Sequence, residues 1–163
     1  MNRKRIHQAM LSAIAAGVPT MIYGAPGVGK SQTVAALAKE TGRVLYDIRA
    51  STLDPVDARG LPVPDVSTGI VKWLIPDFWP QGAEPSILFL DELTNASPAV
   101  QTALLQLVLD RKLGNYVMPA DCVVIAAGNR VQDKSGSVKL ISSMRSRFLQ
   151  LDFDVELGDW CDW

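Results

Sequence analysis

The sequence predicts an α/β fold, a three-layer αβα sandwich whose five-stranded sheet is mostly parallel and which carries two β-hairpin insertions. Two observations lead to this prediction. Short, continuously apolar runs alternate with segments of helical pattern along most of the 163 residues. These runs lack the alternation of a half-exposed strand, so burial on both faces by covering helices is expected. The proline-rich stretch 51–85 interrupts this rhythm, and a second insertion is expected over residues 112–119.

The regular elements follow from the hydrophobic runs and the residues beside them. Helices are predicted over residues 2–16, 30–41, 97–112 and 138–146. Strands are predicted over residues 19–23, 44–49, 86–91, 122–127 and 148–153. Gly42 is expected to end the second helix, because glycine readily adopts the left-handed conformation that follows many helices. Ser97 is expected to cap the third helix, with Pro98 in its first turn.

The proline-rich stretch is expected to contain a hairpin and a packed aromatic pair. Residues 61–66 and 69–74 alternate in the manner of two short strands and are separated by a polar turn. Trp73 lies on this hairpin and is expected to be exposed. Phe78 and Trp79 are flanked by prolines and are expected to pack onto the sheet.

The N-terminal segment permits two interpretations. Three basic residues precede the apolar run 9–16, a pattern that resembles a weak signal peptide. We favour an amphipathic helix, because cleavage after Ala16 would leave the first strand at the new N-terminus. Its buried side is expected to consist of Ile6, Met10, Ala13, Ile14 and Gly17. No apolar run is long enough to span a bilayer, so no membrane partner is expected.

The composition excludes several classes of function. The net charge is −1, so no basic field argues for a nucleic-acid partner. Cys122 and Cys161 have the spacing of neither a metal site nor a disulfide framework, which fits a reducing, cytoplasmic location. His7 is the only histidine and cannot form a metal site alone. The length predicts one domain over residues 1–163.

Residues 24–31 carry the most specific chemical signal. They read Gly-Ala-Pro-Gly-Val-Gly-Lys-Ser, the G-x-x-x-x-G-K-[ST] phosphate loop, between a predicted strand and a predicted helix. Backbone N–H groups of such a loop, together with the helix N-terminus, bind phosphate oxygens. The residues expected to bind the nucleotide are Gly24, Ala25, Pro26, Gly27, Val28, Gly29, Lys30, Ser31 and Gln32. The fold is therefore predicted to be of the P-loop NTPase type, with ATP and Mg²⁺ as cofactors.

Polar residues follow two of the predicted buried strands. Asp91 and Glu92 end the most apolar strand, and Asn129 follows the strand 122–127. Ligands of open α/β sheets bind at the carboxyl ends of strands. We therefore expect Asp91 and Ser31 to hold Mg²⁺, Glu92 to polarise the attacking water, and Asn129 to lie beside Glu92. A turn-forming or helix-capping role is the alternative for the acidic pair and for Asn129.

Two arginines precede the last predicted strand. Arg145 and Arg147 lie in the sequence Met-Arg-Ser-Arg-Phe. They either form a solvated cationic helix end or supply an arginine that completes the site of a neighbouring subunit.

These residues, in this order, resemble the AAA+ ATPases and specifically the MoxR family, over nearly the whole chain. The phosphate loop is similar to Walker A, residues 87–92 to Walker B, Asn129 to sensor 1 and Arg147 to the arginine finger. Arg145 is the less favoured candidate for the finger. Three less generic stretches strengthen the resemblance, at residues 54–62, 76–80 and 100–110.

The resemblance implies an insert near residues 61–75 and a hairpin before sensor 1 near 112–119. It also implies a ring, usually a hexamer, that remodels or activates a client protein, often with a von Willebrand A-domain partner. Family members continue into a helical lid, which is expected to be absent or truncated after residue 163. Trp160 and Trp163 would then be exposed at a cut interface.

The sequence thus predicts an ATPase in which Lys30, Glu92, Asn129 and Arg147 are catalytic. Trp73 and Tyr116 on the two inserts are expected to face a ring pore or a client. A P-loop kinase for small molecules is one alternative, and a nucleotide-gated interaction module with little turnover is another. DNA translocation is disfavoured, because no basic strip interleaved with aromatic residues is present.

Overall fold

A computed structural model describes residues 3–130 and 140–154 of the chain. Its helices are α1 (Arg3–Ala15), α2 (Lys30–Glu40), α3 (Pro55–Arg59), α4 (Pro98–Asp110) and α5 (Ser142–Arg145). The strands of its main sheet are β1 (Thr20–Tyr23), β2 (Val44–Arg49), β5 (Ser86–Asp91), β8 (Cys122–Gly128) and β9 (Leu149–Asp152). The remaining strands form two hairpins, β3 (Leu61–Asp65) with β4 (Ile70–Leu74), and β6 (Lys112–Leu113) with β7 (Tyr116–Val117).

The five-stranded sheet has the order β2-β5-β8-β1-β9, and every neighbouring pair is parallel. The predicted α/β fold is confirmed, with a sheet that is parallel throughout. Strand β8 is buried along its whole length, and β5 along all but its last residue. Because β5, β8 and β1 are parallel neighbours, their carboxyl ends lie at the same edge of the sheet, where the phosphate loop begins.

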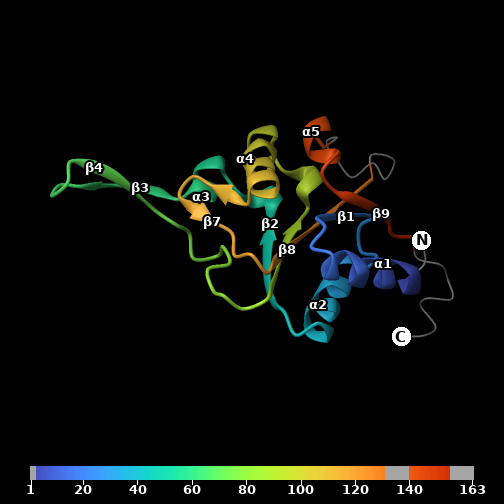
Figure 1. The fold of residues 1–163 in the computed structure, drawn as a ribbon. Coiled ribbons are helices and arrows are strands. Elements are labelled where there is room, and N and C mark those ends of the chain that lie inside the picture. The colour runs from blue at the N-terminus through green and yellow to red at the C-terminus, as the bar shows by residue number, and fades with distance from the viewer. Residues whose placement is uncertain (1–2, 131–139, 155–163) are drawn as a thin grey trace.

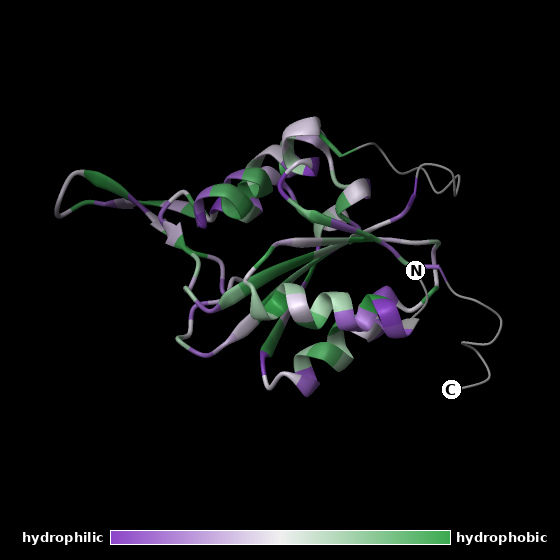
Figure 2. Ribbon diagram, turned by 45° about the vertical axis from the view of Figure 1, so that its right-hand side comes forward, coloured by the Kyte–Doolittle hydropathy of each residue, from purple (hydrophilic) through white to green (hydrophobic). Residues whose placement is uncertain are grey.

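Helices cover both faces of this sheet (Figure 1). On one face, α1 and α2 pack against strand residues such as Ile22, Phe89 and Ile125. On the other face, α4, α3 and α5 pack against a second set that includes Leu88 and Val124. Figure 2 shows the central strands as the most hydrophobic part of the ribbon, between helices of mixed character. Two cores separated by one sheet explain why the apolar runs in the sequence are continuous.

Glycines end α1 and α2 by the same geometry. At the end of α1, Gly17 has φ +65° and donates its N–H to Ile14, while Val18 donates to Ala13. Gly42, with the same φ, ends α2 as predicted. The placement of Gly17 on the buried side of α1 was wrong, because it is exposed and lies beyond the helix. The other four residues of that side, Ile6, Met10, Ala13 and Ile14, are buried as expected.

Two of the remaining helices differ from the prediction. Helix α3 was not predicted; it begins at Pro55, and Asp57 accepts the backbone N–H of Asp54 at 3.3 Å. The helix predicted over 138–146 is limited to α5, and residues 138–139 lie outside the described residues. Ile141 is extended and donates its N–H to the Gln101 side chain, so the helix cannot begin before Ser142.

Hairpin β3–β4 extends away from the rest of the fold (Figure 1). Trp73 is 39% exposed on it, as predicted. Phe78 packs against the core and Trp79 is fully buried, donating its indole N–H to the Ala58 carbonyl at 2.9 Å. The expectation that Tyr116 faces a pore or client was wrong. Its ring stacks on Trp79 with centroids 5.8 Å apart, and its hydroxyl donates to the Pro80 carbonyl at 2.7 Å.

Other predictions fall partly outside the described residues. Cys122 is buried and unpaired, and burial raises the pKa of its thiol. Cys161, Trp160 and Trp163 lie outside the described residues, as does the position where a lid would begin. Within residues 3–130 and 140–154, no helix combines the length and apolar character needed to cross a membrane.

Candidate functional site

A cavity of about 520 Å³ opens at the carboxyl ends of the sheet strands. The predicted site residues that line it are Pro26, Gly27, Gly29, Lys30, Ser31, Gln32, Asp91, Glu92 and Asn129. Gly24, Ala25 and Val28 belong to the same loop without being part of the cavity lining, and neither is Arg147. Four further residues line the cavity that the sequence did not single out, namely Ala35, Asp47, Arg49 and Gly128.

The phosphate loop connects β1 to α2 through left-handed backbone positions. Gly27 has φ +79° and Gly29 has φ +88°, a region that L side chains disfavour. Gly24 donates its N–H to the Gly128 carbonyl at 3.3 Å, which joins the loop to the end of β8. A Cβ at Gly24 would lie 2.9 Å from the Phe153 carbonyl oxygen, so the loop needs a glycine where it leaves the sheet.

Lys30 is the first residue of α2, and its ammonium lies inside the loop. The residue is only 9% exposed. Its Nζ donates to the carbonyls of Gly24 at 2.8 Å and Ala25 at 3.0 Å, and to Asn129 Oδ1 at 3.1 Å. A buried ammonium requires such oxygen partners. The loop, the helix and the end of β8 therefore meet at this one charged group.

Ser31 and Asp91 face each other across the cavity floor. Ser31 donates its hydroxyl to Asp91 Oδ2 at 3.0 Å. Asp91 Oδ1 accepts the N–H of Glu92 at 2.8 Å, so the carboxylate is fixed at both oxygens. A hydroxyl and a carboxylate oxygen at this separation are hard ligands of the kind that Mg²⁺ takes beside phosphate and water.

Glu92 follows β5 in a left-handed conformation, with φ 54°. A non-glycine residue in this region is uncommon and marks a constrained position. Its Oε2 accepts the hydroxyl of Ser51 at 2.5 Å, and its Oε1 lies 3.8 Å from Arg49 Nε. The second carboxylate of the cavity is thus held by residues at and just after the end of β2.

Asp47 adds a third carboxylate to the cavity lining. Partial burial raises the pKa of the Asp47 carboxyl, the Asp91 carboxylate raises it further, and Arg49 opposes both effects. Asp47 and Arg49 are two positions apart on β2, so strand alternation places them on the same face. This alternation along the predicted strand 44–49 was the one feature of the sequence from which Asp47 and Arg49 could have been predicted to lie together.

Asn129 lies where β8 ends, beside Lys30 as well as near the carboxylates. Its backbone N–H donates to the Thr94 hydroxyl at 3.0 Å, and its Oδ1 accepts from Lys30. Thr94 and Ser51 contact site residues without lining the cavity. Neither belongs to a recognisable spacing, so sequence patterns gave no signal for them.

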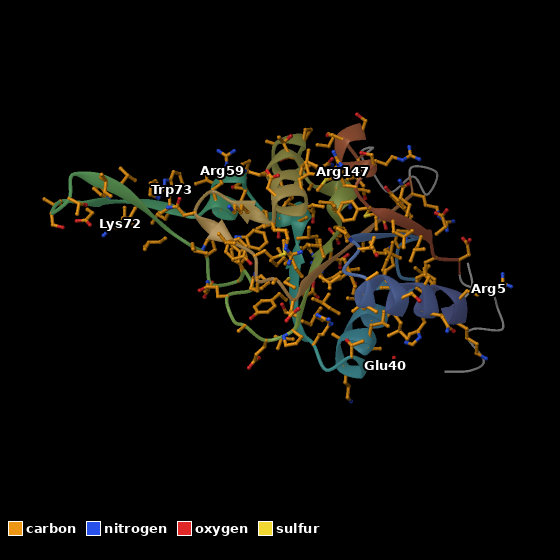
Figure 3. The ribbon with its side chains drawn as sticks, viewed as in Figure 1. Arg5, Glu40, Arg59, Lys72, Trp73 and Arg147 are labelled. Atoms are coloured by element: carbon orange, nitrogen blue, oxygen red, sulfur yellow. The ribbon has the colours of Figure 1, made fainter. Side chains whose placement is uncertain are left out.

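The two arginines near β9 differ in their contacts. Arg145 Nε donates to Gln150 Oε1 at 3.4 Å, and Gln150 Nε2 donates to the Arg145 carbonyl at 3.1 Å. Arg147 is exposed; its backbone N–H donates to the Met144 carbonyl at 3.1 Å, and its side chain makes no hydrogen bond or ion pair with any residue that the structure describes. Figure 3 labels it close to α5, on the other side of the molecule from Trp73.

Comparison with known proteins adds a family match and several related folds. Residues 20–151 match the model of the ATPase family associated with various cellular activities (AAA). The chain is 27% identical to YeaC of Bacillus subtilis (strain 168), a protein of uncharacterised function, over 91% of its own length and 45% of that relative.

Two solved structures show the fold. A candidate ATPase from Cytophaga hutchinsonii ATCC 33406 superposes with a TM-score of 0.71 at 20% identity, over 98% of this chain and 49% of that one. NtrX from Brucella abortus in complex with ATP gives 0.60 at 15% identity, over 91% and 34% respectively. The chain thus spans less than half the length of each of these proteins.

Proposed function

The chain belongs to the ATPase family associated with various cellular activities (AAA), and on this premise we propose that it binds ATP with Mg²⁺ and hydrolyses it to ADP and phosphate. The observation that carries the proposal is the convergence of Lys30, Ser31, Asp91, Glu92 and Asn129 on one cavity. A cation, a hydroxyl–carboxylate pair, a second carboxylate and an amide are the groups that transfer of a phosphoryl group to water requires.

Lys30 would bind the β- and γ-phosphates. Its ammonium is held by two backbone carbonyls and one amide oxygen, all of them neutral. Phosphate oxygens carry charge and form stronger hydrogen bonds to an ammonium, so they would replace these partners. The loop amides and the N-terminus of α2 would add further donors to the same phosphates.

Ser31 and Asp91 would hold Mg²⁺, which supplies charge neutralisation at the phosphates when bound. The chain contributes two oxygens that are already 3.0 Å apart. The bond from the Glu92 N–H to Asp91 Oδ1 leaves Oδ2 directed at Ser31. The ligand pair is therefore set by the backbone turn at Glu92.

Glu92 would orient and polarise the attacking water, and Asn129 would contact the same water or the γ-phosphate. The Glu92 carboxylate accepts from Ser51 at Oε2, and this bond lowers its tendency to take a proton from water. Asn129 Oδ1 is bonded to Lys30, which places the amide next to the expected phosphate position. Both groups thus have a hydrogen-bond partner within the chain when no nucleotide is bound.

The proposal extends to a ring of the MoxR type in which Arg147 completes the site of a neighbouring copy. Both arginines are exposed and lie outside the cavity lining, but only the Arg147 side chain has no hydrogen-bond or ion-pair partner among the described residues, and this difference supports Arg147 over Arg145. Arg145 is bonded to Gln150 of its own chain. An arginine supplied by a neighbouring subunit stabilises the transition-state charge and accelerates hydrolysis ~10³–10⁵-fold.

Hairpin β3–β4 would bind the client protein, with or without a von Willebrand A-domain partner. An isolated two-stranded hairpin is marginally stable in water. This one exposes apolar side chains on both faces, and those more than half exposed are Leu61, Val66, Ile70, Val71 and Leu74. On the face that carries Trp73, the paired residues are Pro62, Pro64 and Val71, with no charge among them.

The backbone of this hairpin favours an extended polypeptide as its ligand. Pro62 pairs with Trp73 and Pro64 with Val71. Proline has no N–H, so these must be the pairs without mutual hydrogen bonds, and the outer edge of β3 offers no donor at either position. The N–H groups of Val71 and Trp73 point to the outer edge of β4, where they are able to bind an added strand.

Steady-state phosphate release from the full chain with ATP and Mg²⁺ tests the central proposal. We expect turnover that EDTA abolishes, and a fall of ~10²–10⁴ in kcat for Glu92→Gln. Binding of ATP, followed by calorimetry, should persist in that variant. Glu84→Gln, an exposed acid away from the cavity, is the matched control.

Three outcomes would overturn the proposal or replace it. Unchanged turnover in Glu92→Gln would remove the assigned base. Transfer of phosphate to a small-molecule hydroxyl, in place of water, would favour a kinase. ATP-dependent association without phosphate release would favour a nucleotide-gated interaction module.

A further inference from the structure

Thr94 is a buried polar residue that contacts a residue of the candidate site without lining the cavity. It lies in the 3₁₀ turn η2 (Leu93–Asn95), two residues after Glu92, and is 3% exposed. Its Oγ1 accepts the backbone N–H of Asn129 at 3.0 Å. The turn that begins at Glu92 therefore also holds the end of β8.

The end of β8 is shaped to admit this contact. A Cβ at Gly128 would lie 2.5 Å from Thr94 Cγ2 and 2.7 Å from Thr94 Oγ1. Separations this short do not occur between real side chains, so Thr94 reaches the Asn129 N–H only because residue 128 is glycine. The pair Thr94 and Gly128 thus forms a fitted contact between η2 and β8.

The contact fixes the backbone from which the Asn129 amide enters the cavity. Asn129 is held at its N–H by Thr94, and its Oδ1 accepts from Lys30 Nζ at 3.1 Å. Asn129 is thus bonded through its backbone to the turn that follows Glu92 and through its side chain to the phosphate-loop lysine. Loss of the Thr94 hydroxyl would leave a partly buried N–H without a partner and free the backbone to shift.

We propose that Thr94 is a positioning residue for hydrolysis, setting the position of Asn129 relative to Glu92 and Lys30. The inference rests on the proposed function, because it assigns Thr94 to the site in which ATP is hydrolysed. Thr94 itself touches neither substrate nor water in this mechanism. It acts through Asn129, and this dependence separates it from a residue that only stabilises the fold.

A double-mutant cycle on the full chain tests this dependence. Thr94→Val keeps the shape of the side chain and removes the acceptor, whereas Thr94→Ser keeps the acceptor. We expect Thr94→Val to lower kcat about 3- to 10-fold, the value of one neutral hydrogen bond, with ATP affinity unchanged within about twofold. Thr94→Ser should restore most of the rate.

The decisive comparison is made in an Asn129→Ala background. If Thr94 acts through Asn129, Thr94→Val has no further effect on kcat there. Thr102→Val, which removes an exposed hydroxyl on α4, is the control and should leave kcat unchanged in both backgrounds. Thr94→Ala carries the same comparison if Thr94→Val does not fold.

The outcomes distinguish a failure of the role given to Thr94 from a failure of the proposed ATPase function. An equal loss of kcat in both backgrounds, or a loss that Thr94→Ser does not rescue, overturns the role of Thr94 and leaves the ATPase assignment standing. Full activity in Thr94→Val does the same. A wild-type chain without turnover overturns the proposed function and this inference with it.

Discussion

Ser51 donates its hydroxyl to Glu92 Oε2 at 2.5 Å, a contact between residues 41 positions apart in the chain. It connects the end of β2 with the left-handed turn after β5. A hydrogen bond to a charged group contributes about 1.5–3 kcal/mol. The carboxylate proposed to activate water is therefore held by its own chain in the structure described here.

Removal of this hydroxyl should speed basal hydrolysis. We expect Ser51→Ala to raise kcat about 3- to 10-fold, because a carboxylate without this hydrogen bond is a stronger proton acceptor. Phosphate release at saturating ATP measures the effect. Ser12→Ala, which removes an exposed hydroxyl on α1, should change nothing. A fall in kcat for Ser51→Ala would instead mean that Ser51 holds Glu92 in its working position.

Arg147 should act between copies of the chain. Arg147→Ala alone is expected to lower kcat by ~10³ or more, and Arg145→Ala far less. An equimolar mixture of Arg147→Ala and Glu92→Gln should regain activity, because about a quarter of head-to-tail interfaces would combine an intact glutamate with an intact arginine. Phosphate release from the mixture and from each variant alone is the measurement. A mixture no more active than its components would place Arg147 outside the site.

The outer edge of β4 should be needed for binding an extended polypeptide. Val71→Pro removes an outward N–H at a position opposite Pro64, so the hairpin ladder is preserved. We expect about tenfold weaker binding of fluorescent β-casein, an unfolded probe, measured by anisotropy. Trp73→Ser tests the apolar face separately.

Val117→Ser, an equally exposed valine on the other hairpin, is the control for this experiment. Loss of binding in Trp73→Ser with full binding in Val71→Pro would show that side chains alone hold the probe. Unchanged binding in both variants would remove the hairpin from client recognition.

Gln101 should be a large contributor to stability, because it is a fully buried polar side chain on α4 that joins two loops. Its Nε2 donates to the Ala96 carbonyl at 3.2 Å, and its Oε1 accepts the N–H of Ile141 at 3.2 Å. Gln101→Leu leaves both backbone groups without these partners, so we expect a loss of about 2–4 kcal/mol in the free energy of unfolding. Urea titration measures it, and the exposed Gln106→Leu should stay within about 0.5 kcal/mol of wild type. An equally small change in Gln101→Leu would contradict the assignment.

Asp47 should destabilise the nucleotide-free fold at neutral pH. Burial and the Asp91 charge raise the pKa of Asp47 above its ordinary value of 3.8, so the folded state disfavours the ionised form. The penalty is complete above the raised pKa and absent below 3.8, where the carboxyl is neutral in both states. Asp47→Asn should therefore raise the melting temperature by about 1–2 °C near pH 7, with solvent screening keeping the effect small, and by nothing near pH 3. A gain that persists in acid would point to packing.

Most of the sheet was predictable because parallel strands are buried on both faces and read as continuous apolar runs. The phosphate loop was predictable because its glycines and lysine have a fixed spacing. Helix α3 was missed since prolines around it hide a five-residue helix, although the Asp54–Asp57 spacing is typical of a helix start. The error at Tyr116 came from treating a hairpin residue as exposed, when Trp79 and the Pro80 carbonyl offered it a ring and an acceptor.

The supporting residues of the site could not be predicted in the same way. Ser51 and Thr94 reach Glu92 and Asn129 through contacts between distant segments, and neither has a spacing that a motif would record. The left-handed backbone at Glu92 depends on what β5 and η2 do on either side of it. Such contacts can be predicted only once the sheet order is known, because that order decides which loops become neighbours.

The same sheet order has a consequence for synthesis on the ribosome. Strand β1, which leads into the phosphate loop, pairs with β8 and β9, so Thr20 lies beside Ile125 and Leu149. At about 5–20 residues per second, roughly 6–24 s pass between translation of the loop and translation of its last supporting strand. Strand β8 is translated before β9, but until β9 follows, β1 has only one of its two neighbours and the loop lacks the Phe153 backbone against which Gly24 packs. The nascent chain therefore completes its nucleotide site only after β8 and β9 have been translated, although the phosphate loop is translated long before them.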